Sequence, residues 1–115
     1  MDDDPVFTGL LKDRLESGGY SSSVSFSLKS AEENIKATNY RYIILDINLP
    51  DGDGLDFVER MPELFSGSII IVVSAFLNSK KRQKAESLGV HKIFEKPCSP
   101  TILLREIDIV HNRKE

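Results

Sequence analysis

The 115-residue sequence contains no tryptophan, only one cysteine and two histidines. Because Cys98 is alone, the chain cannot form an internal disulfide bond. No run of apolar residues approaches the length of a signal-peptide core or a membrane span, so we expect no membrane partner. Both observations favour a protein of the reducing cytoplasm.

The sequence also lacks an excess of basic residues. It has 15 lysines and arginines against 18 aspartates and glutamates, a formal net charge of -3. This balance gives no electrostatic basis for direct binding to nucleic acid. The apolar fraction of 40% and the charged fraction of 29% are typical of a globular protein. A chain of this length is expected to form one domain, over residues 1–115.

The most informative stretch is the strand-like run that ends at Asp46. Four residues that favour buried strands, 42–45, lead directly into this carboxylate, and the chain then turns through a proline and two glycines, at 50, 52 and 54. A continuous apolar strand is typical of a parallel sheet covered on both faces, where ligands collect at the carboxyl ends of the strands. Asp46 is therefore the first candidate functional residue.

Helices and strands are predicted to alternate along the rest of the chain. Asp4 and Pro5 have the pattern of an N-cap and first helical position, for a helix that ends near Gly18. Alternation at residues 24, 26 and 28 predicts a short strand near a sheet edge, and Ser30 with Glu33 predicts a capping box that opens the next helix. Further helices are expected over 55–61, from 78 or 79 to 88 with Gly89 after it, and from 99 or 100 onward, and further strands over 68–74 and around 93–95.

This alternation predicts an α/β fold with a parallel sheet and right-handed crossovers. Three strands end in one polar residue each, Asp46, Ser74 and Lys96. Because parallel strands point the same way, these side chains should meet at one end of the sheet. The acidic cluster at residues 2–4 would join them there if a strand preceded it.

Carboxylates gathered in one crevice repel one another, and a hard divalent cation relieves that repulsion. Mg²⁺ is the natural candidate because it prefers oxygen ligands and completes its octahedron with phosphate oxygens. Lys96 would add a positive charge for a phosphoryl group, and Ser74 would add a hydrogen bond. A carboxylate in this setting can act as a nucleophile and form an aspartyl phosphate.

With these residues in view, the sequence resembles the receiver domains of two-component response regulators, along the whole chain. The matching pieces are Asp2-Asp3 before the first helix, residues 45–54 around Asp46, residues 73–75, and Glu95-Lys96-Pro97. Each piece is weak alone, but their order and spacing together are specific. The resemblance implies a flavodoxin-like three-layer sandwich, with a central parallel sheet in the family order 2-1-3-4-5.

The resemblance also implies a role for each matching residue. Asp46 would accept a phosphoryl group from the phosphohistidine of a sensor histidine kinase or phosphotransfer protein. Asp2, Asp3, Asp46 and the backbone carbonyl of Asn48 would hold Mg²⁺. Ser74 and the backbone N–H of Ala75 would bind the phosphoryl oxygens, and Lys96 would pair with their charge. The peptide between Lys96 and Pro97 would be cis. A downstream effector protein or domain would respond to the phosphorylated state.

Two features depart from the family pattern. Ile93 stands where the family has an aromatic residue that takes part in the switch, and the neighbouring Phe94 should point to the opposite face of its strand. In addition, the family's buried first strand should precede the acidic pair, whereas this chain begins at Met1. We therefore expect a receiver domain shortened at its N-terminus, or one whose empty strand position is filled by another chain or tolerated with rearrangement, and we expect poor stability, a dimer or a strand-swapped oligomer.

Simpler interpretations exist for several of these residues. Asp51 and Asp53 are expected only to cap or stabilise turns, and Asp4 only to cap the first helix. The basic group over residues 80–84 is expected to be a solvated helix face, and Cys98 to pack without reacting. Two alternative functions also remain open: a pseudo-receiver that binds proteins without phosphotransfer, and a small phosphatase that uses Asp46 on an external substrate. The main interpretation is a phosphoacceptor that catalyses only its own phosphorylation and dephosphorylation.

Overall fold

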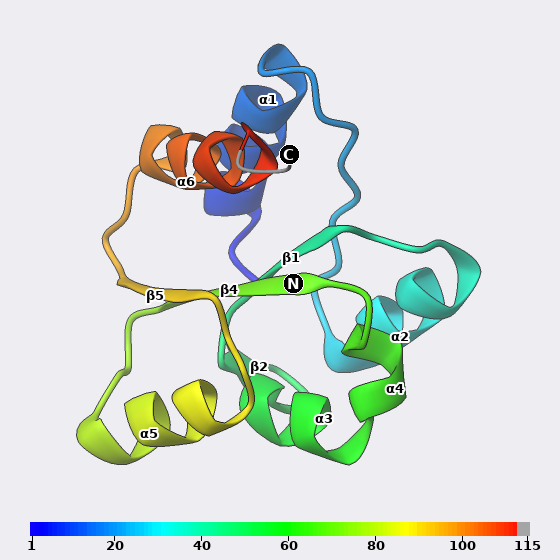
Figure 1. Ribbon diagram of the computed structural model, residues 1–115, viewed down its shortest axis with the longest axis vertical. Helices are drawn as coiled ribbons and strands as arrows, with labels where there is room; N and C mark the ends of the chain where they lie inside the picture. Colours follow the sequence, from blue (N-terminus) through cyan, green and yellow to red (C-terminus); the bar gives the residue numbers. More distant parts are fainter. Residues whose placement is uncertain (113–115) are drawn as a thin grey trace.

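The computed structural model describes residues 1–112, which form a central parallel sheet between two layers of helices (Figure 1). The sheet has the strand order β1-β4-β5, with β1 at Tyr42–Leu45, β4 at Ile69–Ser74 and β5 at Lys92–Glu95. Both strand pairs are parallel, and the register places Leu45 beside Val72 and Ser74 beside Glu95. A two-residue antiparallel pair, β2 (Asn48–Leu49) with β3 (Gly52–Asp53), forms the turn after Asp46.

Six helices within residues 1–112 surround this sheet. Figure 1 shows α1 and α6 on one face, and α2, α3, α4 and α5 on the other side of the molecule. The bounds of the helices are α1 Pro5–Ser17, α2 Leu28–Ala37, α3 Gly54–Arg60, α4 Pro62–Phe65, α5 Ser79–Ser87 and α6 Pro100–Asn112. The α/β class and the three-layer arrangement predicted from the sequence are thus confirmed.

Each face of the sheet has its own apolar core. Ile71 and Val73 of β4, neither of them exposed, pack with residues of α1 and α6. Val72, the residue between them, points to the other face, where it packs with residues of β1, α2, α3, α4 and α5. The unbroken apolar run in β4 is therefore explained by burial on both sides of the sheet.

Local signals account for the ends of several helices. The Asp4 carboxylate accepts hydrogen bonds from the backbone N–H groups of Val6 and Phe7, which confirms Asp4 as the cap of α1. Gly89 follows α5 with a φ of +82°, a conformation that favours glycine. α3 ends at Arg60 and α4 begins at Pro62, so the proline separates two short helices.

The short strand expected at residues 24–28 is wrong. Residues 21–25 have no assigned secondary structure, and Leu28 is already the first residue of α2. The capping box at Ser30 is also wrong, because Ser27 caps this helix and accepts a hydrogen bond from the backbone N–H of Ser30. The Asp51 carboxylate accepts two more, from the N–H groups of Leu28 and Lys29, at 2.8 and 3.1 Å. This long-range contact starts the helix earlier than the local pattern indicates.

At the position of the family's first strand, which we expect this chain to lack, only Met1 and Asp2 form backbone hydrogen bonds with neighbouring segments. The Met1 ammonium donates to the carbonyl of Ile44 at 2.9 Å, and the N–H of Asp46 donates to the carbonyl of Met1 at 2.8 Å. On its other side, the N–H of Asp2 donates to the carbonyl of Ser25 at 3.0 Å. Within residues 1–112 no strand precedes α1, and the segment around Ser25 lacks the neighbour that would make it a strand.

No helix within residues 1–112 has the length and apolar character needed to cross a membrane.

Candidate functional site

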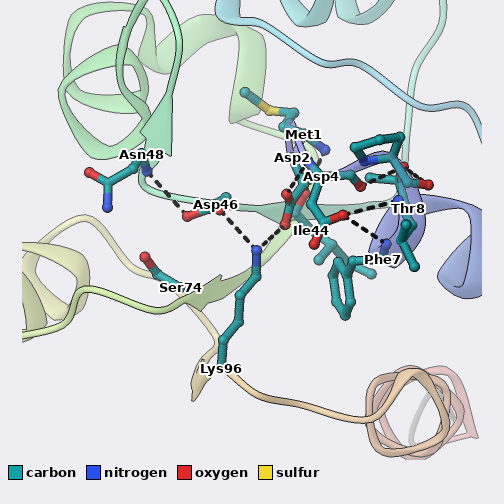
Figure 2. Close-up of polar contacts among 12 residues, drawn as sticks. Met1, Asp2, Asp4, Phe7, Thr8, Ile44, Asp46, Asn48, Ser74 and Lys96 are labelled. Carbon is teal, nitrogen blue, oxygen red and sulfur yellow. Dashed lines mark hydrogen bonds and ion pairs between the residues drawn. The ribbon is translucent and has the colours of Figure 1, made fainter.

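The carboxyl ends of the three parallel strands bring together the polar residues that follow them (Figure 2). Asp46 directly follows β1, Ser74 is the last residue of β4, and Lys96 directly follows β5. The Lys96 ammonium donates to the Asp46 carboxylate at 3.1 Å, and the Ser74 side chain is fully buried beside them. The predicted convergence of these three residues is confirmed.

Asp2 completes the polar centre from the N-terminal side. Its carboxylate lies 2.7 Å from the Lys96 ammonium, so one lysine bridges Asp2 and Asp46. Its other oxygen accepts a hydrogen bond from the backbone N–H of Asp4 at 3.0 Å, which fixes the carboxylate just before α1. Asp2 and Asp46 are both buried, and Asp3 is exposed. Burying two carboxylates is favourable only with this kind of pairing.

Two positive groups balance these carboxylates. Burial opposes the charge of Lys96, but the hydrogen bonds to Asp2 and Asp46 outweigh it and raise the pKa of Lys96. The Met1 ammonium is more deeply buried, and burial lowers its pKa to about 6 despite the opposing effect of the Asp2 and Asp46 carboxylates. Lys96 is therefore the stable positive charge at neutral pH.

The turn after Asp46 holds this residue in place. One Asp46 oxygen accepts a hydrogen bond from the N–H of Asn48 at 3.2 Å, and the N–H of Gly54 donates to the carbonyl of Ile47 at 2.7 Å. A Cβ atom at position 54 would lie 2.6 Å from the backbone oxygen of Asp46. Gly54 therefore allows the close approach of α3 to the site.

The acidic residues have the chemistry of a magnesium site. One carboxylate oxygen from each of Asp2, Asp3 and Asp46 lies within 4.8 Å of the others. Mg²⁺ binds oxygen at about 2.0–2.1 Å, so its ligands are at most about 4.2 Å apart, and these side chains need only small movements to fit it. The role of the Asn48 carbonyl as a further ligand stays a prediction, since only the N–H of Asn48 contacts Asp46.

A small hollow opens on the exposed side of this centre. It has a volume of about 370 Å³, and its lining includes Ala75, Lys96, Pro97 and Phe7. The peptide between Lys96 and Pro97 is cis, as expected. The backbone N–H of Phe76, two residues after Ser74, lies 3.5 Å from the Ser74 hydroxyl oxygen. The hollow therefore borders Lys96 and Ala75, the residue directly after Ser74, while Asp46 does not line it.

Other acidic and basic residues have the structural roles expected of them. Asp53 caps α3 by accepting hydrogen bonds from Leu55 and Asp56, and Asp51 supports α2 as described above. In the basic group of α5, Lys84 pairs with Asp56 and Glu59, and Arg82 pairs with Glu95 at 3.3 Å. These pairs are exposed and do not join the carboxylate centre.

Phe7 is a neighbour of the site that the sequence pattern missed. Its ring lies 5.0 Å from the Lys96 ammonium, a distance at which the ring face attracts a cation. In the sequence, Phe7 is simply an apolar residue near the start of the predicted first helix. Its position one turn after the Asp2-Asp3 pair was the available signal that it lies near the strand ends.

Ile93 and Phe94 lie on opposite faces of β5, as expected. Ile93 packs against the core on the side of α3 and α5, and Phe94 packs against the core on the side of α1 and α6. The position where receiver domains usually have an aromatic switch residue therefore holds an aliphatic side chain. Cys98 is partly buried, and burial raises the pKa of its thiol, which disfavours reactivity.

The family model described as the response regulator receiver domain matches residues 1–108. The chain belongs to this family. Receiver domains are the signalling modules of two-component systems, and the sheet, the buried Asp46 and the cis peptide agree with that membership.

Relatives of this receiver domain differ in length. It is 29% identical to an uncharacterized 14.6 kDa protein of Leptolyngbya boryana, over 91% of this chain and 82% of the relative. It is 26% identical to the probable transcriptional regulatory protein y4xI of Sinorhizobium fredii, and the alignment covers 88% of this chain and 45% of that protein. It is also 26% identical to the sensor protein EvgS of Escherichia coli K12, of which it spans 9%.

Solved structures have the same fold. The chain aligns with a CheY-like receiver domain protein from Methanospirillum hungatei with a TM-score of 0.89 and 24% identity, covering 96% of this chain and 89% of the other. It aligns with a two-component response regulator from Clostridium difficile with a TM-score of 0.90 and 24% identity, covering 97% and 92%. These alignments confirm the receiver fold independently of sequence motifs.

Proposed function

We propose that this receiver domain is a phosphoacceptor whose Asp46 takes a phosphoryl group from the phosphohistidine of a sensor histidine kinase or a phosphotransfer protein. The observation that carries the proposal is the contact between the buried Asp46 carboxylate and Lys96 at the carboxyl end of a parallel sheet. A structural aspartate at this position would need no partly buried lysine and no second buried carboxylate beside it. The cytoplasm, where two-component kinases present their phosphohistidines, is the proposed location.

Each residue of the site has a separate role in phosphoryl transfer. An Asp46 oxygen bonds to phosphorus while the bond from phosphorus to the histidine nitrogen breaks, and the imidazole leaves with that electron pair. Lys96 then pairs with the phosphoryl oxygens in place of its present contact with Asp46. The Ser74 hydroxyl and the N–H of Ala75 donate hydrogen bonds to the same oxygens, which requires a small movement of the chain after β4.

Asp2, Asp3 and Asp46, with the Asn48 carbonyl, are the proposed ligands of Mg²⁺. The bound ion supplies positive charge that stabilises the phosphoryl oxygens during transfer. The carboxylate spacing supports this assignment, because three oxygens lie within 4.8 Å of one another. Attack of water on the acyl phosphate would later return Asp46 to its free form, so the domain acts only on itself.

Phosphorylation would bias a two-state equilibrium in the domain. Movement of Ser74 toward the phosphoryl group would alter the surface formed by α5 and β5, and a downstream effector protein or domain would bind one state better than the other. We expect weaker coupling between phosphorylation of Asp46 and the surface of α5 and β5 than in receivers with an aromatic residue at position 93. The aliphatic side chain of Ile93 cannot repeat the movement of an aromatic ring.

The test is intact mass after incubation with acetyl phosphate. We expect a gain of one phosphoryl group that requires Mg²⁺, disappears with a chelator and is absent from Asp46→Asn. Asp51→Asn is the matched control, since it makes the same chemical change at an exposed aspartate nearby and should still gain the group.

The alternative functions give different results in the same experiment. Ile93 and the limited pairing at Met1 favour the pseudo-receiver. This alternative predicts no mass gain and no change in the NMR spectrum on addition of Mg²⁺. The phosphatase predicts release of more than one phosphate per chain from a phosphate ester. It would also need a general acid near Asp46, but His91 pairs with Glu106, and His111 contacts Tyr42.

A further inference from the structure

The Phe7 ring lies against the ammonium group that bridges the two buried carboxylates (Figure 2). The Lys96 ammonium is 5.0 Å from the centre of this ring, within the roughly 6 Å over which a ring face attracts a cation. The same ammonium lies 2.7 Å from an Asp2 oxygen and 3.1 Å from an Asp46 oxygen. The lysine side chain is only 19% exposed, so the ring contact is stronger than one on the open surface.

One hydrogen-bonded turn positions both the Asp2 carboxylate and the Phe7 ring. Asp2 accepts a hydrogen bond from the backbone N–H of Asp4 at 3.0 Å. The Asp4 carboxylate in turn accepts one from the N–H of Phe7 at 3.2 Å. The ring is partly buried and packs against the core formed by α1, β4 and α6. The backbone and the core together therefore fix the place of the ring beside Lys96.

Phe7 and Lys96 face the same hollow, whereas the two carboxylates do not. The lining of this hollow of about 370 Å³ includes Phe7, Lys96 and Ala75, and neither Asp2 nor Asp46 belongs to it. Movement of the ammonium away from the carboxylates and into the hollow would keep it next to the ring. The ring can thus partly replace a carboxylate partner that the ammonium gives up.

We propose that Phe7 is a positioning residue for Lys96, whose ring holds the ammonium at the hollow when the ammonium leaves the carboxylates. The inference rests on the proposed phosphoacceptor function, in which Lys96 exchanges its contact with Asp46 for the phosphoryl oxygens. Phe7 itself touches no reacting atom. A side chain without a ring would leave the ammonium held by the carboxylates alone, which makes Asp46 a weaker nucleophile and a weaker metal ligand.

The first experiment locates Lys96 by NMR and requires no phosphoryl transfer. Protons above the face of an aromatic ring are shielded, so the protons next to the Lys96 ammonium should move downfield in Phe7→Leu and keep their wild-type position in Phe7→Tyr. Phe26→Leu is the matched control and should not shift them. Phe26 is half-exposed, and within residues 1–112 no cation lies over its ring.

The second experiment measures the Mg²⁺ affinity by NMR titration and the rate of phosphorylation by acetyl phosphate. Phe7→Leu should weaken Mg²⁺ binding about twofold to fivefold and slow phosphorylation about threefold to tenfold. Phe7→Tyr and Phe26→Leu should stay close to the wild type in both properties.

A graded series separates the attraction of the ring from its packing. Phenylalanines with one, two and three ring fluorine atoms, placed at position 7, keep the shape of the side chain and lower the electron density of the ring face. Both the Mg²⁺ affinity and the rate should fall stepwise with the number of fluorine atoms. Because the packing is retained, this series tests the role of Phe7 even if leucine weakens the fold.

Three results would overturn the proposal. These are Lys96 resonances that are identical in the wild type and Phe7→Leu, an Mg²⁺ affinity that does not depend on fluorination, and equal losses in Phe26→Leu and Phe7→Leu. Failure of the proposed function gives a different result, because the wild-type protein would then gain no phosphoryl group. In that case the Lys96 resonances and the Mg²⁺ affinity would still decide whether Phe7 positions Lys96.

Discussion

The Lys96 ammonium lies 3.1 Å from the Asp46 carboxylate, although the two residues are 50 positions apart in the sequence. The same ammonium contacts Asp2 at 2.7 Å, so in the absence of a metal ion it is the cation that holds the two buried carboxylates together. A divalent ion at Asp2, Asp3 and Asp46 would share these carboxylates with Lys96. The lysine and the metal therefore compete in part for the same negative charge.

Lys96→Met should strengthen Mg²⁺ binding by about tenfold, because removal of the positive charge leaves the carboxylates more attractive to the metal, an electrostatic change of about 1.4 kcal/mol. It should also slow phosphorylation by acetyl phosphate. Titration with Mg²⁺ followed by NMR measures the affinity. Lys80→Met, at an exposed position on α5, should change neither property. Weaker metal binding in Lys96→Met would contradict the competition.

Gly54→Ala should destabilise the fold and disturb the site. The added Cβ would lie 2.6 Å from the backbone oxygen of Asp46, and such overpacking costs about 1–3 kcal/mol. Urea unfolding measures the change. Gly9→Ala is the control, because Gly9 lies in α1 with no atom within 4 Å of the added Cβ, and it should stabilise by about 0.5–1 kcal/mol. Equal effects of the two substitutions would show that the close contact at Gly54 is unimportant.

Asp51→Ala should lower the urea midpoint without changing the phosphoryl gain at Asp46. The carboxylate accepts hydrogen bonds from the first two N–H groups of α2, and alanine accepts none. Asp51→Asn should lose less stability, since its amide oxygen can still accept one bond. Loss of phosphorylation in both variants, with the fold intact, would instead give Asp51 a functional role.

Tyr20 should keep its proton to unusually high pH. Burial and the hydrogen bond to Asp108, at 2.7 Å, raise the pKa of Tyr20 to about 12. Because the folded pKa lies above the unfolded value of 10.0, the stabilisation from this pair is complete below about pH 10 and is lost as pH rises through 12. Ultraviolet titration of the phenols measures the pKa. Tyr20→Phe should remove the late-titrating phenol and weaken this loss of stability at high pH.

The 115-residue polypeptide by itself should be poorly stable or should associate with itself. Within residues 1–112 no strand pairs with the outer edge of β1, and an open strand edge favours pairing with another strand. Urea unfolding at several protein concentrations, together with sedimentation, measures both properties. A cooperative unfolding transition of a monomer at low concentration would contradict this expectation.

Local patterns in the sequence were sufficient for most of the fold. The apolar runs that became β1 and β4, the cap at Asp4 and the glycine after α5 are short-range features that act within a few residues. Because both strands end in a polar residue and run parallel, the meeting of Asp46 and Ser74 with Lys96 could also be predicted. Membership of the receiver family was evident from the same residues.

Long-range contacts decided the rest. Residues 24–28 alternate like a strand, but no strand within residues 1–112 pairs with them, and the Asp51 carboxylate binds the backbone N–H of Leu28 at the start of α2. The place of Phe7 beside Lys96 depends on how α1 packs against the sheet. The sequence by itself determined the elements and the reactive residues, because periodicity and capping are local. Only the tertiary structure decided which edges stay open and which charges meet, because these depend on partners far away in the chain.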